Sequence, residues 1–175
     1  MPDLIRQTAA VLRINGERWH ALATGLDGEV LARRPAPGEW SALDCLGHTV
    51  DTEAAVFAAR VRAILAGRDF RAFDPDAEGT PITDQADPAE LAARHAELRA
   101  ASIRVVESVT AADLHRTARH SELGIVSMRE LLNEWFAHDT MHLVQAERAI
   151  IQPFIAGSGP WRPYFADHDV EVLRG

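Results

Sequence analysis

Two histidines four residues apart, His138 and His142, are the side chains of this sequence best suited to metal chemistry. They lie in the stretch 133–145 (NEWFAHDTMHLVQ), and in a helix their imidazoles stand one above the other on the same face. Two imidazoles in this geometry can bind one metal ion, but they do not complete its coordination shell. A third ligand must therefore come from elsewhere in the chain. Any coordination position of the metal that stays open is available to a water molecule or a substrate.

The surrounding sequence places both histidines on the inner face of a predicted helix. At about 100° per residue they share that face with apolar and amide side chains, namely Leu131, Trp135, Gln145 and Ala149. Two interpretations remain open at this point. Each histidine could be a core residue satisfied by a hydrogen bond, or one cation could be the shared partner of both.

His48 is the natural third ligand, although helical spacing alone does not select it. It lies nearly opposite the apolar face of its own predicted helix, among small and mostly uncharged side chains. Such a face can also be buried, because a helix in a bundle touches two neighbours. The remaining histidines compete with it: His20, His95, His115, His120 and His168.

Hydrophobic periodicity predicts four helices of roughly 20 residues each. Their expected bounds are about 3–25, 41–67, 87–109 and 127–151. Helix-capping signals mark three starts: Ser41 with Asp44, Asp87 with Pro88, and Ser127 with Glu130. The segments 26–40, 68–86 and 115–126 are predicted to be connections without strands, and 110–114 a short helical turn.

These elements predict an all-α protein, a four-helix bundle formed by a single domain over residues 1–175. The second connection is long enough to cross the length of the bundle, so the topology need not be a simple up-down-up-down. The C-terminal tail beyond Pro153 is predicted to be irregular. We expect this tail to pack on the bundle, because it contains four large aromatic residues: Phe154, Trp161, Tyr164 and Phe165.

Composition indicates an ordinary globular protein and disfavours nucleic acid as a partner. The 175 residues are 47% hydrophobic and 25% charged, with a formal net charge of -8. Phosphate binding requires clustered Lys and Arg, which we do not find, so we expect no nucleic-acid partner. The small-molecule substrate that we expect follows instead from the open positions of the predicted metal site. The apolar run at 54–59 leads us to consider a homodimer as well.

The cellular location is expected to be the cytoplasm. The start Met1-Pro2-Asp3 leads directly into an amphipathic pattern, so we expect no signal peptide. No apolar run is long enough to span a bilayer, so we expect no membrane association. A single cysteine, Cys45, cannot form an internal disulfide, which agrees with a reducing compartment.

The combination of motifs is more specific than each motif alone. It consists of Gly38-Glu39-Trp40-Ser41, then His48 eight residues after the tryptophan, then His138-Asp139-x-x-His142-x-x-Gln145. With the order of the four helices, this combination resembles the DinB/YfiT-like superfamily of small metalloproteins. In that family a tryptophan precedes the first histidine, and a late helix supplies the other two. Leu143 stands where an arginine commonly follows the last histidine.

The resemblance implies an up-down-down-up bundle with one divalent ion, such as zinc or nickel, bound by His48, His138 and His142. Three protein ligands leave positions open, as in catalytic sites. Relatives include S-transferases and isomerases that use bacillithiol, mycothiol or glutathione, so the resemblance favours a metal-dependent transferase with a low-molecular-weight thiol as co-substrate. The alternatives are a metal-dependent hydrolase and a non-enzymatic, stress-related binding bundle with a structural metal.

Carboxylates near the predicted ligands could support the site. One turn from a ligand is a suitable position for an acceptor of the imidazole N–H. The candidates are Asp44, Asp51, Glu134 and Asp139. The alternative is that Asp44 only caps a helix and that Asp139 faces solvent.

Three further residues have two interpretations each. Cys45, three residues before His48, could approach the metal or could be a small buried apolar residue. Trp40 and Trp135 could cover the site or belong to the core. The sequence identifies no catalytic residue and no organic cofactor.

Overall fold

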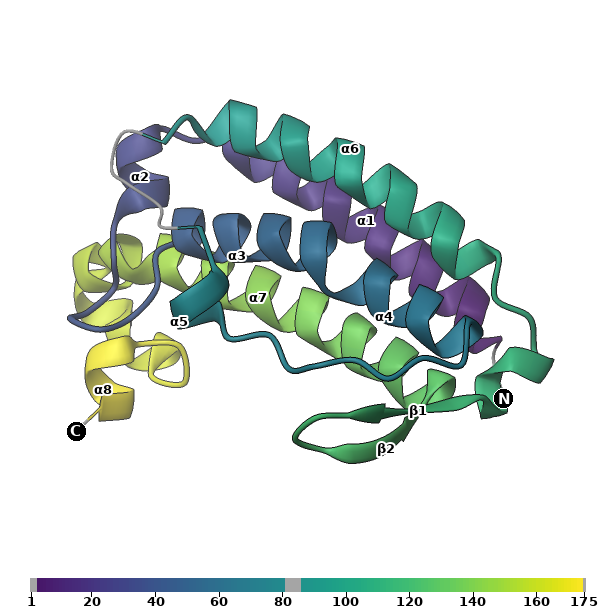
Figure 1. The fold of residues 1–175 in the computed structure, drawn as a ribbon. Helices are drawn as coiled ribbons and strands as arrows, with labels where there is room; N and C mark the ends of the chain where they lie inside the picture. Colours follow the sequence, from purple (N-terminus) through teal and green to yellow (C-terminus); the bar gives the residue numbers. More distant parts are fainter. Residues whose placement is uncertain (1–2, 81–85, 175) are drawn as a thin grey trace.

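The computed structural model describes residues 3–80 and 86–174, and most of them are helical (Figure 1). The α-helices are α1 (Leu4–Gly25), α2 (Gly28–Ala32), α3 (Ala42–Ala55), α4 (Phe57–Leu65), α5 (Pro75–Glu78), α6 (Pro88–Glu107), α7 (Met128–Gly157) and α8 (Val170–Arg174). Two 3-10 helices span Ala112–His115 and Gly159–Phe165, and the strands are β1 (Thr117–His120) and β2 (Gly124–Ser127). None of the helices in these two ranges is long and apolar enough to cross a membrane.

The long helices form a four-helix bundle, which confirms the predicted all-α fold. Helix α1 packs against α6 and α7, and α3 packs against the same two helices, so α1 and α3 occupy opposite corners. In Figure 1, α3 and α6 both start at the end of the bundle where α1 ends. The segment 68–80, which follows α4 in the sequence, runs back along the bundle on the side of α7, as expected for a long second connection.

The predicted helix starts are confirmed in detail. The hydroxyl of Ser41 accepts a hydrogen bond from the Asp44 N–H at 3.0 Å, and the Asp44 carboxylate accepts one from the Ser41 N–H at 2.9 Å. Ser127 and Glu130 form the same reciprocal box at the start of α7, and Asp87 caps α6. The boxes on α3 and α7 fix where the two histidine-bearing helices begin.

Two helix boundaries differ from the prediction. The helix expected at 41–67 is divided at Val56, whose φ of -109° and ψ of -77° depart from helical values. The hydrogen-bond ladder continues through this point, since the Val56 N–H bonds to Thr52 O at 3.0 Å. Helix α7 continues past 151 to Gly157 with Pro153 inside it, so this proline does not end the helix.

The connection predicted at 115–126 contains a β-hairpin instead of an unstructured loop. Strands β1 and β2 pair antiparallel, with His120 opposite Gly124. The segment that returns along the bundle joins the hairpin, since the Phe70 N–H bonds to Arg119 O at 3.1 Å. Each strand has only four residues, which is too short for a reliable alternating pattern in the sequence.

The aromatic tail forms short helical turns and contacts α7, as predicted, although its aromatic rings are not buried. The exposed fractions are 66% for Phe154, 64% for Trp161, 84% for Tyr164 and 39% for Phe165. Polar contacts hold the tail in place. Gln152 of α7 accepts a hydrogen bond from the Val170 N–H at 3.0 Å, and Arg162 pairs with Asp169 at 2.7 Å.

A buried ionic network joins the four long helices. The side chain of Arg99, on α6, is 3% exposed and pairs with Asp139 of α7 and, at 3.0 Å, with Glu53 of α3. Its Nη1 donates to the backbone oxygen of Leu12 in α1 at 2.8 Å. The Nε2 atom of His95 lies 3.0 Å from Nη2 and must accept this hydrogen bond, because a guanidinium only donates. We refer to these groups as the Arg99 network.

The carboxylates of the Arg99 network have further partners. Asn15 of α1 donates to Asp139 at 2.8 Å, and the indole of Trp135 donates to Glu53 at 3.3 Å. Burial raises the pKa of Glu53, although the charge of Arg99 opposes this shift. Burial also lowers the pKa of His95 to about 3, which keeps its imidazole neutral at physiological pH. The guanidinium of Arg99 is thus the cation paired with two buried carboxylates, those of Glu53 and Asp139.

Arg99→Met should lower the free energy of unfolding by about 3–5 kcal/mol, because it leaves two buried carboxylates without their cation. Denaturant titration of the metal-free protein measures this loss. The matched control is Arg18→Met, which breaks the partly exposed Arg18–Glu147 pair between α1 and α7. That change should cost less than about 1 kcal/mol. Equally small losses in both variants would contradict a central role for Arg99.

Candidate metal centre

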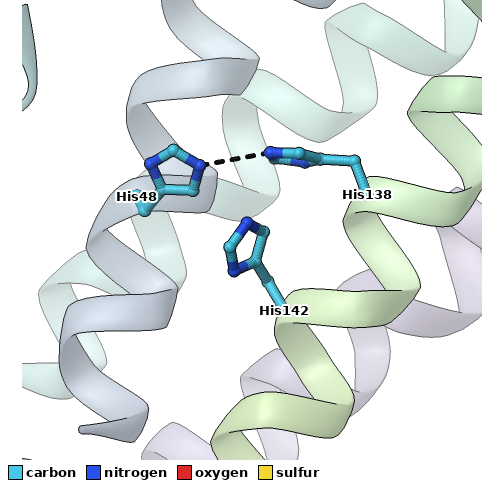
Figure 2. Close-up of side chains that lie close together, drawn as sticks. All are labelled: His48, His138 and His142. Atoms are coloured by element: carbon cyan, nitrogen blue, oxygen red, sulfur yellow. Dashed lines mark hydrogen bonds between the residues drawn. The ribbon is translucent and has the colours of Figure 1, made fainter. Parts of the chain in front are cut away.

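The structure brings His48, His138 and His142 together at one point of the bundle (Figure 2). His48 comes from α3, and the other two come from α7. Each ring offers one nitrogen, and the three nitrogens lie within 4.8 Å of one another. The predicted third histidine thus lies beside the predicted pair, while metal binding itself stays a prediction.

The closest pair of ring nitrogens has a spacing that fits a metal ion. Zinc–imidazole bonds are 2.0–2.1 Å long, so two nitrogens on one tetrahedral ion are about 3.3 Å apart. The Nε2 atoms of His48 and His138 are 3.1 Å apart, close to this value. The chemistry of the donors also fits, because imidazole suits zinc, copper, iron and nickel.

Gln145 holds the ring of His142 in an orientation suited to a metal. Its Oε1 atom lies 3.0 Å from Nδ1 of His142. Because an amide oxygen only accepts hydrogen bonds, Nδ1 carries the proton and Nε2 keeps its lone pair. In Figure 2 this second nitrogen points toward the rings of His48 and His138. An outer hydrogen bond of this kind is typical of metal-binding histidines.

The environment keeps the three imidazoles neutral. Burial, assisted by the neighbouring His142, lowers the pKa of His48 to about 4. Burial and the two other rings lower the pKa of His138 to about 3. Burial also lowers the pKa of His142, against the opposing effect of its bond to Gln145. Neutral imidazole is the form that binds metal, so the ligands need not release protons at neutral pH.

Two aromatic side chains pack against the histidine rings. The indole of Trp40 stacks on His142, with ring centroids 5.7 Å apart and 19° between the planes. It also lies 5.1 Å from His48. Phe57 meets His138 edge-on at 5.0 Å. Trp40 therefore covers the site, in agreement with one of its two interpretations.

A cavity of about 230 Å³ opens beside His48 and is also lined by Trp40 and Asp51. Thr80, at the end of the returning segment, lines it as well. Asp51 accepts hydrogen bonds from the Thr80 N–H at 2.6 Å and from its hydroxyl at 2.8 Å. Asp51 thus attaches the returning segment next to the candidate ligands, a role that the sequence did not indicate.

The other three candidate carboxylates have roles outside the histidine cluster. Asp44 caps α3 and pairs with Arg34 at 3.1 Å. Asp139 is buried in the Arg99 network, so the alternative that it faces solvent is wrong. Glu134 lines a different cavity. Within the described part of the chain, none of them is hydrogen-bonded to the three histidines of the cluster.

Cys45 and Trp135 are core residues. Cys45 is fully buried in an apolar cluster with Trp19 and Leu46. Burial raises the pKa of its thiol to about 12, so it stays protonated and is a poor metal ligand. Trp135 is fully buried and stacks on Phe57 at 5.0 Å. Both observations confirm the simpler of the two interpretations.

The competing histidines do not join the cluster. His95 belongs to the Arg99 network, and His120 accepts backbone hydrogen bonds within the hairpin turn. The other three are exposed: His20, His115 and His168. Across residues 3–80 and 86–174, no further His, Cys, Asp or Glu offers a ligand atom to the three clustered histidines.

Comparison with the models of known protein families identifies a match over most of the chain. The model of the DinB superfamily matches residues 12–146, which include all three clustered histidines. No curated protein matches the chain at a significant level.

Metal affinity should stay nearly constant from about pH 7.5 to about pH 5.5. The pKa values of about 4 for His48 and about 3 for His138 mean that protons compete for these nitrogens only in more acidic solution. Competition with a chromophoric chelator measures the zinc affinity at each pH. A steep loss beginning at the ordinary histidine pKa of about 6.5 would contradict this account.

The same pKa shifts predict acid sensitivity of the metal-free protein. In the unfolded chain, His48, His95 and His138 take up protons below about pH 6.5, whereas in the folded protein these three histidines do not until about pH 3–4. Stability should therefore fall as the pH drops through this window, which thermal unfolding at several pH values measures. His95→Gln should flatten the slope, because it removes one of these groups. An unchanged slope would contradict a neutral His95.

Proposed function

The chain belongs to the DinB superfamily, and on that premise we propose that it binds one divalent metal ion through His48, His138 and His142. We propose further that it is a metal-dependent enzyme of the S-transferase type. In this reaction a low-molecular-weight thiol gives up its proton, its sulfur bonds to an electrophilic carbon, and the leaving group departs with its electron pair.

One observation carries this proposal: the cluster has three histidines and no fourth protein ligand among the described residues. Structural zinc sites use four protein ligands, whereas catalytic sites use three and keep a position for substrate. The cavity lined by His48 supports access of a small molecule to that position.

The metal and the protein would contribute differently. A divalent ion held by the histidines would supply Lewis acidity and lower the pKa of a thiol that binds beside it. The protein supplies neutral ligands, with Gln145 orienting His142. Trp40 excludes water from one side of the rings, and Asp51 keeps the returning segment in place. Zinc and nickel both suit this ligand set.

The carboxylates near the cavity favour thiol transfer over hydrolysis. Hydrolysis requires a base that takes a proton from the attacking water. Asp44 and Asp51 line the cavity, but the first is bound to Ser41 and Arg34 and the second to Thr80. A thiol that ionises at the metal requires no such base. Hydrolysis with Asp51 as the base remains the second candidate, because Asp51 is next to His48 in the cavity lining.

If the chain is a non-enzymatic binding protein, a different coordination of the metal is expected at the same site. A metal that joins α3 to α7 would stabilise the bundle in either case. Only an enzyme requires that the metal keep a position for an external molecule. The cavity beside His48 supports the enzyme.

Wild-type protein should bind one Zn²⁺ or Co²⁺ per chain, and His48→Ala and His142→Ala should each weaken binding by at least tenfold, because two imidazoles do not hold the ion as three do. Equilibrium dialysis with metal analysis measures both. The matched control is His20→Ala, an exposed histidine of α1 that should bind like wild type. A wild-type protein that stays metal-free in excess Zn²⁺ and Ni²⁺ overturns the proposal.

Glutathione added to the Co²⁺-loaded protein should produce a sulfur-to-cobalt absorption band, because the thiol occupies the open position. Titration at neutral pH gives the affinity. S-Methylglutathione is the control and should give no band, since it cannot form a thiolate. Absence of the band with all thiols tested, in protein that holds stoichiometric cobalt, would favour the hydrolase or the binding bundle.

A further inference from the structure

A larger cavity, of about 350 Å³, is formed where the returning segment passes the junction of α3 and α4. This size is within the range of small-molecule sites. The returning segment contributes Phe70 and Phe73, and the two helices contribute small apolar side chains: Ala55, Val56, Ala59 and Ala63. None of the three clustered histidines lines this cavity, so the proposed reaction does not account for it.

The hairpin holds the Phe70 wall of the cavity in place. The Ser121 N–H donates to the backbone oxygen of Phe70 at 3.2 Å, in addition to the bond between Phe70 and Arg119 described above. The ring of Phe70 also meets that of His120 edge-on, with centroids 5.5 Å apart. A wall that is already ordered costs little entropy when a ligand binds.

Arg60, on α4, brings a guanidinium to this cavity without an acceptor for its hydrogens. Its Cζ atom lies 5.4 Å from the centroid of Phe70, and no residue in the described ranges accepts a hydrogen bond from it. Burial lowers the pKa of Arg60, and the negative charge of Glu134 opposes this shift. Glu134 lines a neighbouring cavity but not this one. A half-buried cation of this kind favours an anionic acceptor on its open side.

The other charged side chains of the lining leave the cavity positive. Arg71 is paired with Glu78, so these two charges compensate each other. Asp69 accepts a backbone hydrogen bond from the hairpin at 3.0 Å. Arg68 is exposed and forms no ion pair with a described residue. Arg60 and Arg68 therefore outweigh Asp69, in a protein whose net charge is -8.

The charge of Arg60 also acts on the histidine cluster. Burial is the largest cause of the low pKa of His138, and Arg60 is one of the charges that lower it further. Val56 lines the cavity, and the next residue, Phe57, contacts the ring of His138. A cation that disfavours a proton on His138 also disfavours a divalent metal there. An anion bound beside Arg60 would offset this repulsion.

We propose that this cavity binds an apolar carboxylate anchored by Arg60, and that its occupancy strengthens metal binding by the three histidines. The planar guanidinium matches the two oxygens of a carboxylate, and the alanines and Phe73 offer an apolar surface for the body of the ligand. The carboxylate site does not depend on the proposed function, whereas its effect on the metal rests on it.

The first test compares benzoate with benzamide, which has nearly the same shape but no charge. Ligand-detected NMR on the metal-free protein gives both affinities, and the absence of metal prevents the carboxylate from binding to an ion instead. Benzoate should bind about tenfold more tightly, because its hydrogen bond to Arg60 is charge-assisted.

Two variants and a control assign this preference to Arg60. Arg60→Met should abolish the preference for benzoate, and Arg60→Lys should keep part of it, because the charge remains while the planar fork is lost. Arg62→Met removes the same charge from an exposed position of α4 that does not line the cavity, and should leave the preference unchanged.

The second test measures the zinc affinity with and without saturating benzoate, by competition with a chromophoric chelator. Because coupling between two sites is reciprocal, benzoate should raise the zinc affinity of the wild type by about fivefold. It should leave the zinc affinity of Arg60→Met unchanged. An equal rise in both proteins would mean that benzoate binds the metal directly, and would overturn the coupling through Arg60.

The outcomes separate this inference from the proposed function. Equal or undetectable binding of benzoate and benzamide by the wild type, or a preference that survives Arg60→Met, overturns the carboxylate site even if the histidines bind zinc. A preference for benzoate that depends on Arg60, in a protein that binds no zinc, supports the carboxylate site and counts against the proposed function.

Discussion

The pairing of Arg99 with Asp139 and Glu53 is the interaction on which the rest of the structure depends. Its partners come from α3 and α7, and the same guanidinium reaches the backbone of α1. Asp139 directly follows His138 in α7, so the ion pair that holds this helix against α6 also fixes the rotation that turns His138 toward α3. Glu53 lies five residues after His48 on α3. The helices that carry the three clustered histidines are therefore aligned by one buried cation.

The sequence predicted the parts of this arrangement that follow local rules. The capping boxes of α3 and α7, the four long helices and the inward face of His142 all follow from spacing and helix chemistry. The Arg99 network did not, because hydropathy predicts a surface position for an arginine, whereas the structure buries Arg99. An arginine enters a core only when acids from distant segments surround it, and helical spacing does not contain that information. The polar series His95, Arg99 and Ser102 was the available signal.

The parts of the site that the sequence did not predict also depend on contacts between segments far apart in the chain. Helical spacing left His48 as one of several candidates, and the resemblance to a family was needed to select it. Asp51 and Thr80 meet only because the second connection returns along the bundle. The aromatic tail was expected to pack on the bundle because of its composition; it does contact α7, but polar contacts attach it and its rings remain exposed. The sequence left open whether Trp40 covers the site or belongs to the core. In the structure it covers the histidines and lines two cavities.

We propose that three neutral histidines hold one metal ion and leave a position for a thiol. X-ray absorption spectroscopy of the zinc-loaded protein tests it most directly, before and after a thiol is added. We expect three imidazole nitrogens and one light external ligand at about 2.0–2.1 Å, and a sulfur at about 2.3 Å once the thiol is present. Four protein ligands in both spectra, or no ordered zinc at all, would contradict it.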